Sequence, residues 1–319
     1  QVFALIERHQ IRCELTRTGT IHAAHAASGF EDLRLRHLEW QRLGAPVHLL
    51  GPQEVAERTG TAAFAGGLLD ARAGTINPMG YCRGLARAAR GAGAQISTGV
   101  TARKLVKTDT GWEVLTDLGT VTAKYVVLGT NAYSDSLWPG LRQTYTTIPY
   151  FQLATEPLGD RVHNILPERQ GLWDTGQIMF SLRRDMSDRL IIGSMGAVQG
   201  SVGRGLSQRW AQRRLARLFP GLGPVRFEQA WHGQIAMTPD HLPRIHELDT
   251  GLYTAIGYNG RGITTGTLFG EAIAGLLTGD DPANLPLPLS EPRRLPAAPV
   301  MSGLYRIAFA ANQMVRGIW

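Results

Sequence analysis

The sequence lacks the features that mark secreted, membrane-spanning and metal-binding proteins. It has only two cysteines, Cys13 and Cys82, which are too few for a disulfide framework and lack zinc spacing, so we expect a reducing, cytoplasmic location. No run of about 18 or more apolar residues appears, and the N-terminal residues show no signal-peptide pattern, so no spanning helix is expected. His22, His25 and His37 have no carboxylate partner at metal-ligand spacing, which predicts no metal site.

The net positive charge comes without a nucleic-acid-binding motif. The chain carries 33 Lys and Arg against 26 Asp and Glu, a formal net charge of +7. Its basic residues are scattered, with small clusters at 183–185 and 209–217. We therefore expect solvated surface charge, and no nucleic acid as a partner.

A glycine-rich dinucleotide fingerprint is also missing. No strand–GxGxxG–helix unit lies near the N-terminus, and the nearest candidate, GAGAQI at 91–96, ends a helix instead of opening one. The first residue is Gln1, and the sequence opens inside an apparent amphipathic helix. We therefore expect an N-terminally truncated chain, with any pyrophosphate fingerprint upstream of it.

The most informative segment is GYNGRGITTGTLFGEAIAGLL at 257–277, which follows TPDHLP at 238–243. Gly257, Gly260 and Gly262 come after the apolar run LYTAIG, and a helical pattern follows them at once. This order predicts a strand, a tight loop and a helix N-terminus, whose free N–H groups and positive dipole end suit negative charge. A plain tight connection in an α/β domain is the alternative interpretation.

The middle of the chain resembles part of a doubly wound domain. A helix at 79–92 precedes residues 94–133, which have a β pattern with one strand reaching Val100 and turns near Gly111 and Gly119. The pattern ends in a buried apolar strand, KYVVLG, and then in Gly129, Thr130 and Asn131. Such a series is typical of the second half of a nucleotide-binding domain.

Taken in order, several segments resemble the D-amino-acid-oxidase-like flavoprotein family, which includes glycine, sarcosine and γ-glutamylputrescine oxidases. The matching segments are GLLDARAGTINPMGYCRGLARAARGAGAQI, AKYVVLGTNAYS, FQLATEPL, TPDHLP and GYNGRGITTGTLFGEAIAGLLTG. LGTNAYSDSLWPGL followed by ATEPL looks most like the γ-glutamylputrescine oxidase branch. The resemblance implies an α/β fold in which a Rossmann-like FAD-binding domain, incomplete at its N-terminus, is interleaved with an α+β substrate domain.

On this resemblance the chain divides into five parts. The predicted parts are 1–64 (substrate domain), 65–139 (FAD-binding domain), 140–230 (substrate domain), 231–280 (FAD-binding domain) and 281–319 (a Pro-rich segment and a C-terminal amphipathic helix).

The resemblance also implies FAD-binding roles. The loop would wrap the flavin and the following helix would face its N1/C2=O edge, Val100 would approach the adenine, and Gly129–Asn131 the pyrophosphate. The predicted cofactor-binding residues are Val100, Gly129, Thr130, Asn131, Gly257, Tyr258, Gly260, Arg261, Gly262, Ile263 and Thr264. An ordinary β residue at Val100 and an ordinary glycine turn at Gly129 are the alternatives.

Three departures from the family pattern bear on the substrate. Ile235 stands where amino-acid-specific members have an arginine, Thr264 where sarcosine-type members have a basic residue, and Gly233 where they have the flavin-tethering cysteine. FAD should therefore be non-covalent, and a small-molecule amine fits better than an α-amino acid. Carboxylate capture by Arg183, Arg184 or Arg261 stays open, with a solvated surface arginine as the alternative.

The implied reaction is oxidation of a C–N bond, with hydride transfer to flavin N5 and hydrolysis of the imine. We name no catalytic residue, because this chemistry needs no indispensable side-chain base. The candidate substrate-binding residues are Trp231, His232, Tyr258 and Arg183. Core packing for Trp231 and a structural role for His232 are the alternatives. The sequence leaves the oligomeric state open.

A competing hypothesis is a non-catalytic, membrane-surface role for residues 303–319. Trp319, Phe309 and Ile307 would face the lipid while Arg306 and Arg316 extend toward the headgroups. The alternative is a C-terminal helix packed on its own domain.

Overall fold

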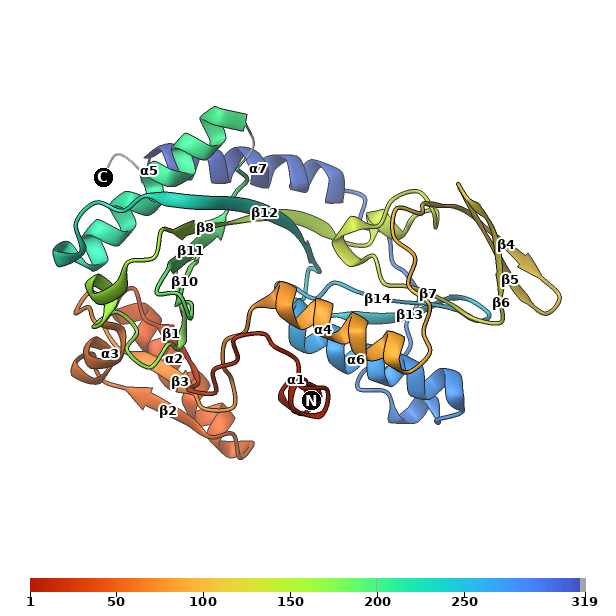
Figure 1. Ribbon diagram of the computed structural model, residues 1–319, viewed down its shortest axis with the longest axis horizontal. Coiled ribbons are helices and arrows are strands. Elements are labelled where there is room, and N and C mark those ends of the chain that lie inside the picture. The colour runs from red at the N-terminus through yellow and green to blue at the C-terminus, as the bar shows by residue number, and fades with distance from the viewer. Residues whose placement is uncertain (199, 316–319) are drawn as a thin grey trace. The chain divides into compact units, whose positions relative to one another are not determined.

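The computed structural model describes residues 1–198 and 200–315 (Figure 1). Its α-helices are α1 (Val2–Arg8), α2 (Ala27–Arg42), α3 (Pro52–Thr59), α4 (Pro78–Gly91), α5 (Gly200–Leu218), α6 (Gly262–Thr278) and α7 (Ala298–Val315). Its strands are β1 (Thr20–Ala23), β2 (Val47–Leu50), β3 (Gly67–Asp70), β4 (Ala102–Thr108), β5 (Gly111–Thr116), β6 (Gly119–Ala123), β7 (Val126–Leu128), β8 (Thr146–Thr155), β9 (Gly171–Asp174), β10 (Phe180–Arg184), β11 (Leu190–Met195), β12 (Phe227–Met237), β13 (Arg244–Asp249) and β14 (Leu252–Ile256). This mixture confirms the predicted α/β class.

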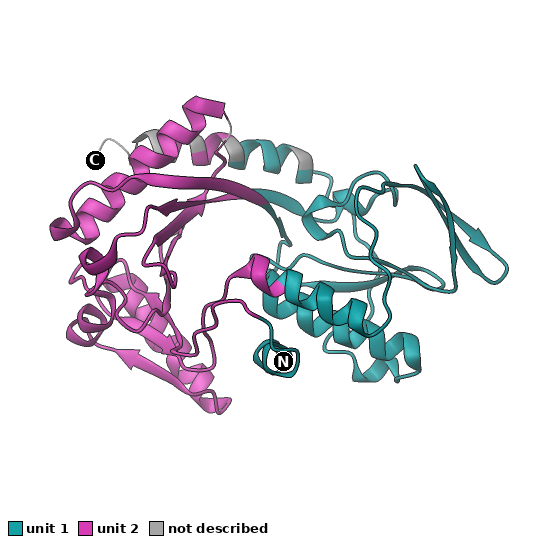
Figure 2. Ribbon diagram, viewed as in Figure 1, with its two compact units in different colours: residues 1–11, 82–148, 234–305 teal, residues 12–81, 149–233, 306–319 magenta. Residues whose placement is uncertain are grey.

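The chain forms two compact units, each built from segments that are distant in sequence (Figure 2). The first unit comprises residues 1–11, 82–148 and 234–305, and the second comprises residues 12–81, 149–233 and 306–319. From the sequence we predicted domain boundaries at 64/65, 139/140, 230/231 and 280/281. Assignment of cofactor and substrate to particular parts stays a prediction.

Two three-stranded sheets form the first unit. One has the order β13-β14-β7, with β14 and β7 parallel, and the other is the antiparallel meander β4-β5-β6. All five residues of β14 are buried, because the strand is covered on both faces and needs no polar alternation. Phe269 and Ile273 of α6 pack against Tyr253 and Ala255 of β14. The predicted turns at Gly111 and Gly119 are confirmed.

The second unit contains the larger sheet, with the order β12-β8-β11-β10-β9-β1-β3-β2. Phe151 and Leu153 of β8 belong to the same buried core cluster as Trp210 and Leu215 of α5. The intervening residues of β8 point the other way, as the two-residue period of a strand requires. On that side Tyr150 Oη donates to Ser181 Oγ of β10 at 2.9 Å. At β8 and β10 one face of the sheet is therefore apolar and the other carries polar side chains.

The predicted strand at Val100 is wrong. Residues 94–101 form no strand, and Val100 lies half-buried in irregular chain. A strand requires a partner for its backbone groups, and no ladder reaches this segment in the described part of the chain. The predicted strand KYVVLG is also shorter than expected. Among the described strands β7 pairs with β14 alone, and Val127 is 45% exposed.

The C-terminal helix α7 begins earlier than predicted. Phe309 is buried, which corrects its predicted position facing lipid, whereas Ile307 is 70% exposed. Trp319 and Arg316 lie outside the described residues, as does the Arg306 side chain. Among the helices that are described, none is long and apolar enough to span a bilayer.

Candidate cofactor and substrate sites

The segment from β14 through α6 has the predicted strand–loop–helix structure. The strand ends at Ile256, and the helix begins at Gly262 after a five-residue loop. Gly257, Asn259 and Gly260 have positive φ angles of 75°, 51° and 85°. A Cβ atom at Gly257 would lie 2.5 Å from Thr238 Cγ2, so both conformation and space require glycine there.

Two asparagine side chains hold this loop in place. Asn131 Oδ1 accepts the Gly257 N–H at 3.0 Å, and Asn259 Oδ1 accepts the Thr238 N–H at 2.9 Å. Asn259 Nδ2 donates to the Gly257 carbonyl at 2.5 Å and to Thr238 Oγ1 at 3.1 Å. These bonds connect the loop to the segments that follow β7 and β12, and they fix the direction in which α6 starts.

The N-terminus of α6 is left open by this arrangement. Within the described chain, no side chain caps the helix at Arg261, and Gly262, Ile263 and Thr264 are all exposed. A Cβ atom at Gly262 would be 3.8 Å from its nearest neighbour, Tyr258 Cδ2, so the surface beside the helix end is clear. First-turn N–H groups with no intrahelical partner bind electron-rich groups. The open helix end is therefore available to an electron-rich group, and contact with the N1/C2=O edge of a flavin stays a prediction.

The predicted cofactor residues after β7 meet the glycine loop. Gly129 and Thr130 follow Leu128, and Asn131 has a φ angle of 39° as it enters a short 3₁₀ turn. A Cβ atom at Gly129 would meet no described atom within 4 Å. The Asn131–Gly257 bond thus brings the 129–131 and 257–264 segments together in the first unit, whereas Val100 lies in the irregular segment that follows α4.

Tyr258 faces the helix side of its loop. Its ring packs edge-on against Phe269 with centroids 6.1 Å apart, and burial raises the pKa of its hydroxyl. This packing gives Tyr258 a structural role beneath α6, and contact with substrate stays a prediction.

The other predicted substrate residues belong to the second unit. Arg183 Nη1 donates to the Ile76 carbonyl at 2.6 Å, and burial lowers the pKa of its guanidinium. Trp231 is 43% exposed on β12, and His232 beside it is half-buried. Arg184 is buried and bonded to Asp188 at 2.8 Å, so carboxylate capture by Arg184 is excluded. Trp231 therefore remains available as an aromatic surface.

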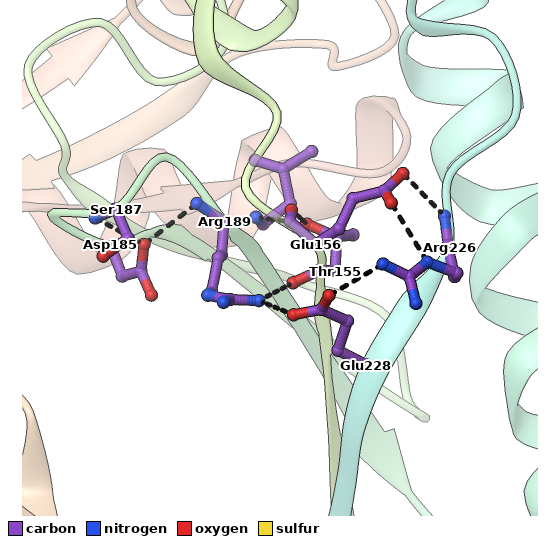
Figure 3. Close-up of polar contacts among 8 residues, drawn as sticks. Thr155, Glu156, Asp185, Ser187, Arg189, Arg226 and Glu228 are labelled. Atoms are coloured by element: carbon purple, nitrogen blue, oxygen red, sulfur yellow. Dashed lines mark hydrogen bonds and ion pairs between the residues drawn. The ribbon is translucent and has the colours of Figure 1, made fainter.

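An ion-pair cluster holds strand ends of the larger sheet together (Figure 3). Arg189 Nη1 donates to the Thr155 carbonyl at 2.7 Å and to Glu228 at 2.5 Å. Arg226 donates to Glu156 at 3.1 Å and to Glu228 at 2.9 Å. Because acidic partners already compensate both arginines, neither is a candidate for binding a substrate carboxylate.

Sequence reasoning missed three polar residues. The Asn259 side chain holds the loop in place through hydrogen bonds. An asparagine directly before Gly260 is a turn signal that could have identified it. Gln234 N donates to Tyr133 Oη at 3.0 Å, and Gln234 Oε1 is a buried acceptor without a donor among the described atoms. Nothing in the local sequence marks Gln234 or Tyr133. Within the described ranges, no three His, Cys, Asp or Glu side chains gather as a metal site requires.

His22 provides a pH-dependent prediction within the second unit. Burial and the nearby Arg36 lower the pKa of His22 to about 4, while its ring stacks on Trp173 with centroids 5.2 Å apart. The unfolded chain, with the ordinary pKa of 6.5, then binds a proton that the folded chain does not. As pH falls from 6.5 toward 4, we expect stability to drop by about 2 kcal/mol more in the wild type than in His22→Asn. Urea unfolding across this pH range measures it, and parallel profiles would contradict the assignment.

Comparisons with known proteins find a matching family model and similar proteins. The family model described as FAD dependent oxidoreductase (DAO) matches residues 2–276. Gamma-glutamylputrescine oxidoreductase of Escherichia coli (strain K12) is 30% identical over 278 residues, which are 86% of this chain and 65% of that relative. The chain thus spans less than two thirds of that relative's length.

Solved structures share the fold. Glycine oxidase from Geobacillus kaustophilus has a TM-score of 0.74 and 22% identity, covering 91% of this chain and 79% of that one. L-proline dehydrogenase from P. horikoshii has a TM-score of 0.74 and 18% identity, covering 89% of this chain and 77% of that one.

Proposed function

Because the chain belongs to the family of FAD-dependent oxidoreductases, we propose that the protein oxidises a C–N bond of an amine or amino acid. The observation that carries this proposal is the open N-terminus of α6, held in place by Asn131 and Asn259. Bound FAD would accept the hydride from the carbon next to the amine nitrogen.

The residues of the chain would supply binding and electrostatics. The first-turn N–H groups at Gly262, Ile263 and Thr264 and the positive helix end favour the negative charge that the flavin edge carries after reduction. The Asn131 and Asn259 bonds keep these donors fixed, so little reorganisation accompanies the reaction. Gly129 leaves room for close backbone approach to the pyrophosphate. The imine then hydrolyses in water.

An amine resembling γ-glutamylputrescine is the substrate class that we propose. Ile235 and Thr264 are uncharged, and the family resemblance implies basic residues at these positions in carboxylate-binding relatives. Gly233 provides no thiol to tether FAD. The similarity to gamma-glutamylputrescine oxidoreductase supports the same choice. An anaerobic panel of amines and amino acids tests it: an amine should bleach the bound flavin faster than α-amino acids do. Bleaching by neither class would contradict the proposal.

Thr264→Lys should shift the preference toward carboxylates. Thr264 is exposed in the first turn of α6, so a lysine there has room to reach solvent or substrate. We expect kcat/KM for N-methyl amino acids to rise about tenfold relative to plain amines, since a charge-assisted bond adds roughly 1.5 kcal/mol. Thr264→Gln, which is neutral, is the control. An equal effect of both variants would show that residue 264 does not contact the substrate.

A further inference from the structure

Helix α7 presents an apolar face to solvent in addition to the apolar face that it buries. Ala298, Ser302 and Phe309 are buried, and Ser302 Oγ accepts the Thr147 N–H at 3.1 Å, which fixes the helix on the protein. Val300, Leu304 and Ile307 are 65%, 54% and 70% exposed.

The exposed residues form one continuous stripe. With 100° per residue, positions 300, 304, 307 and 311 lie within about 60° of one another and opposite the buried set. Met301 and Ala308 widen the stripe, and no polar or charged residue interrupts it. It runs for about 16 Å along the helix. A helix that faced only water on this side would have polar residues here.

The charged residues that lie nearest to this stripe in the sequence are all positive. Residues 292–319 contain four arginines and no aspartate or glutamate. Arg293 and Arg294 precede the helix, Arg306 lies within it, and Arg316 follows its last described residue. A second copy of the same face would bring arginines against arginines, whereas anionic lipid headgroups complement them.

We propose that the outward face of α7 docks on an anionic lipid bilayer, with Val300, Leu304 and Ile307 entering the boundary between headgroups and acyl chains. The stripe is far shorter than the roughly 30 Å of a hydrocarbon core, so the helix would lie in the interface plane and not cross it. The buried face of α7 stays packed on the protein, which makes this a peripheral attachment independent of the proposed reaction.

Vesicle flotation tests this surface with the intact protein. We expect the wild type to float with vesicles of phosphatidylcholine mixed with phosphatidylglycerol, less with phosphatidylcholine alone, and less at high salt. Leu304→Glu/Ile307→Glu should reduce the floated fraction about tenfold or more, since it removes two inserted side chains and adds two repelled charges. Leu43→Glu/Leu118→Glu is the control, with the same charge change at leucines that are 83% and 77% exposed elsewhere.

Several outcomes would overturn the proposal. Absence of wild-type flotation would do so, as would equal flotation of both double variants. A wild-type dimer that light scattering detects and Leu304→Glu/Ile307→Glu abolishes, without lipid binding, would show that a second copy covers the face. Val300→Asn/Leu304→Asn, with folding checked by circular dichroism, repeats the test without added charge.

Discussion

Gly262→Val should weaken FAD binding without unfolding the protein. Among the described atoms, a Cβ atom at this position meets Tyr258 Cδ2 alone, at an ordinary contact distance of 3.8 Å. The residue opens α6, where valine costs no more than glycine in helix propensity. A branched side chain would instead occupy the space that the flavin edge needs. We expect FAD affinity to fall by about 1–3 kcal/mol, roughly 5- to 150-fold, with amine oxidation falling in parallel.

Gly270→Val is the matched control for this result. Gly270 lies two turns further along α6, is exposed, and would place a Cβ atom within 4 Å of no described atom. Gly270→Val adds the same side chain to the same helix, at a position away from the loop. FAD titration of both apoproteins, with circular dichroism spectra, separates cofactor contact from helix damage. Normal FAD affinity in Gly262→Val would show that the loop connects β14 to α6 without contacting FAD.

Asp174→Ala should cost about 3–5 kcal/mol of stability, because it leaves a partly buried guanidinium without its carboxylate. Asp174 is 4% exposed, and its oxygens accept from Arg214 Nη2 at 2.9 Å and from the Phe180 N–H at 3.0 Å. Burial raises the pKa of Asp174, although Phe180 and Arg214 act in the opposite direction. Burial of the charged Asp174–Arg214 pair therefore has a cost in desolvation free energy.

A double-mutant cycle checks this explanation. Removing both charges in Asp174→Ala/Arg214→Met should cost much less than the sum of Asp174→Ala and Arg214→Met, since the guanidinium that loses its carboxylate is then absent too. Urea unfolding of the single and double variants gives the coupling free energy. A double variant that is as unstable as the sum of its single variants would mean that the two side chains act independently.

The features that the sequence predicted well are local ones. The apolar run Leu252–Ile256, the glycines after it and the periodic helix lie next to each other in the chain, so their residue types alone define strand, loop and helix. Turns at Gly111 and Gly119 were predictable for the same reason, because each turn depends on a glycine within it. These two glycines adopt positive φ angles of 152° and 142°.

Features that depend on distant partners were not predictable. Val100 has β-compatible neighbours, yet a strand forms only where another strand offers a ladder. The Asn131–Gly257 bond joins residues 126 positions apart, and nothing near either residue reveals it. Tyr258 lies in the loop, but its ring turns under α6 because Phe269 is placed there by the helix. The sequence left Arg184 open as a candidate, because its burial beside Asp188 depends on how the chain folds.

We expect the loop before α6 to bind FAD without a covalent bond. Acid precipitation of the purified protein, followed by flavin quantification in supernatant and pellet, tests it most directly. Gly233 offers no thiol for attachment, so the flavin should be released to the supernatant as FAD, in an amount that falls in Gly262→Val and is unchanged in Gly270→Val. Flavin that stays with the precipitated protein, or equal FAD content in all three proteins, would contradict the account.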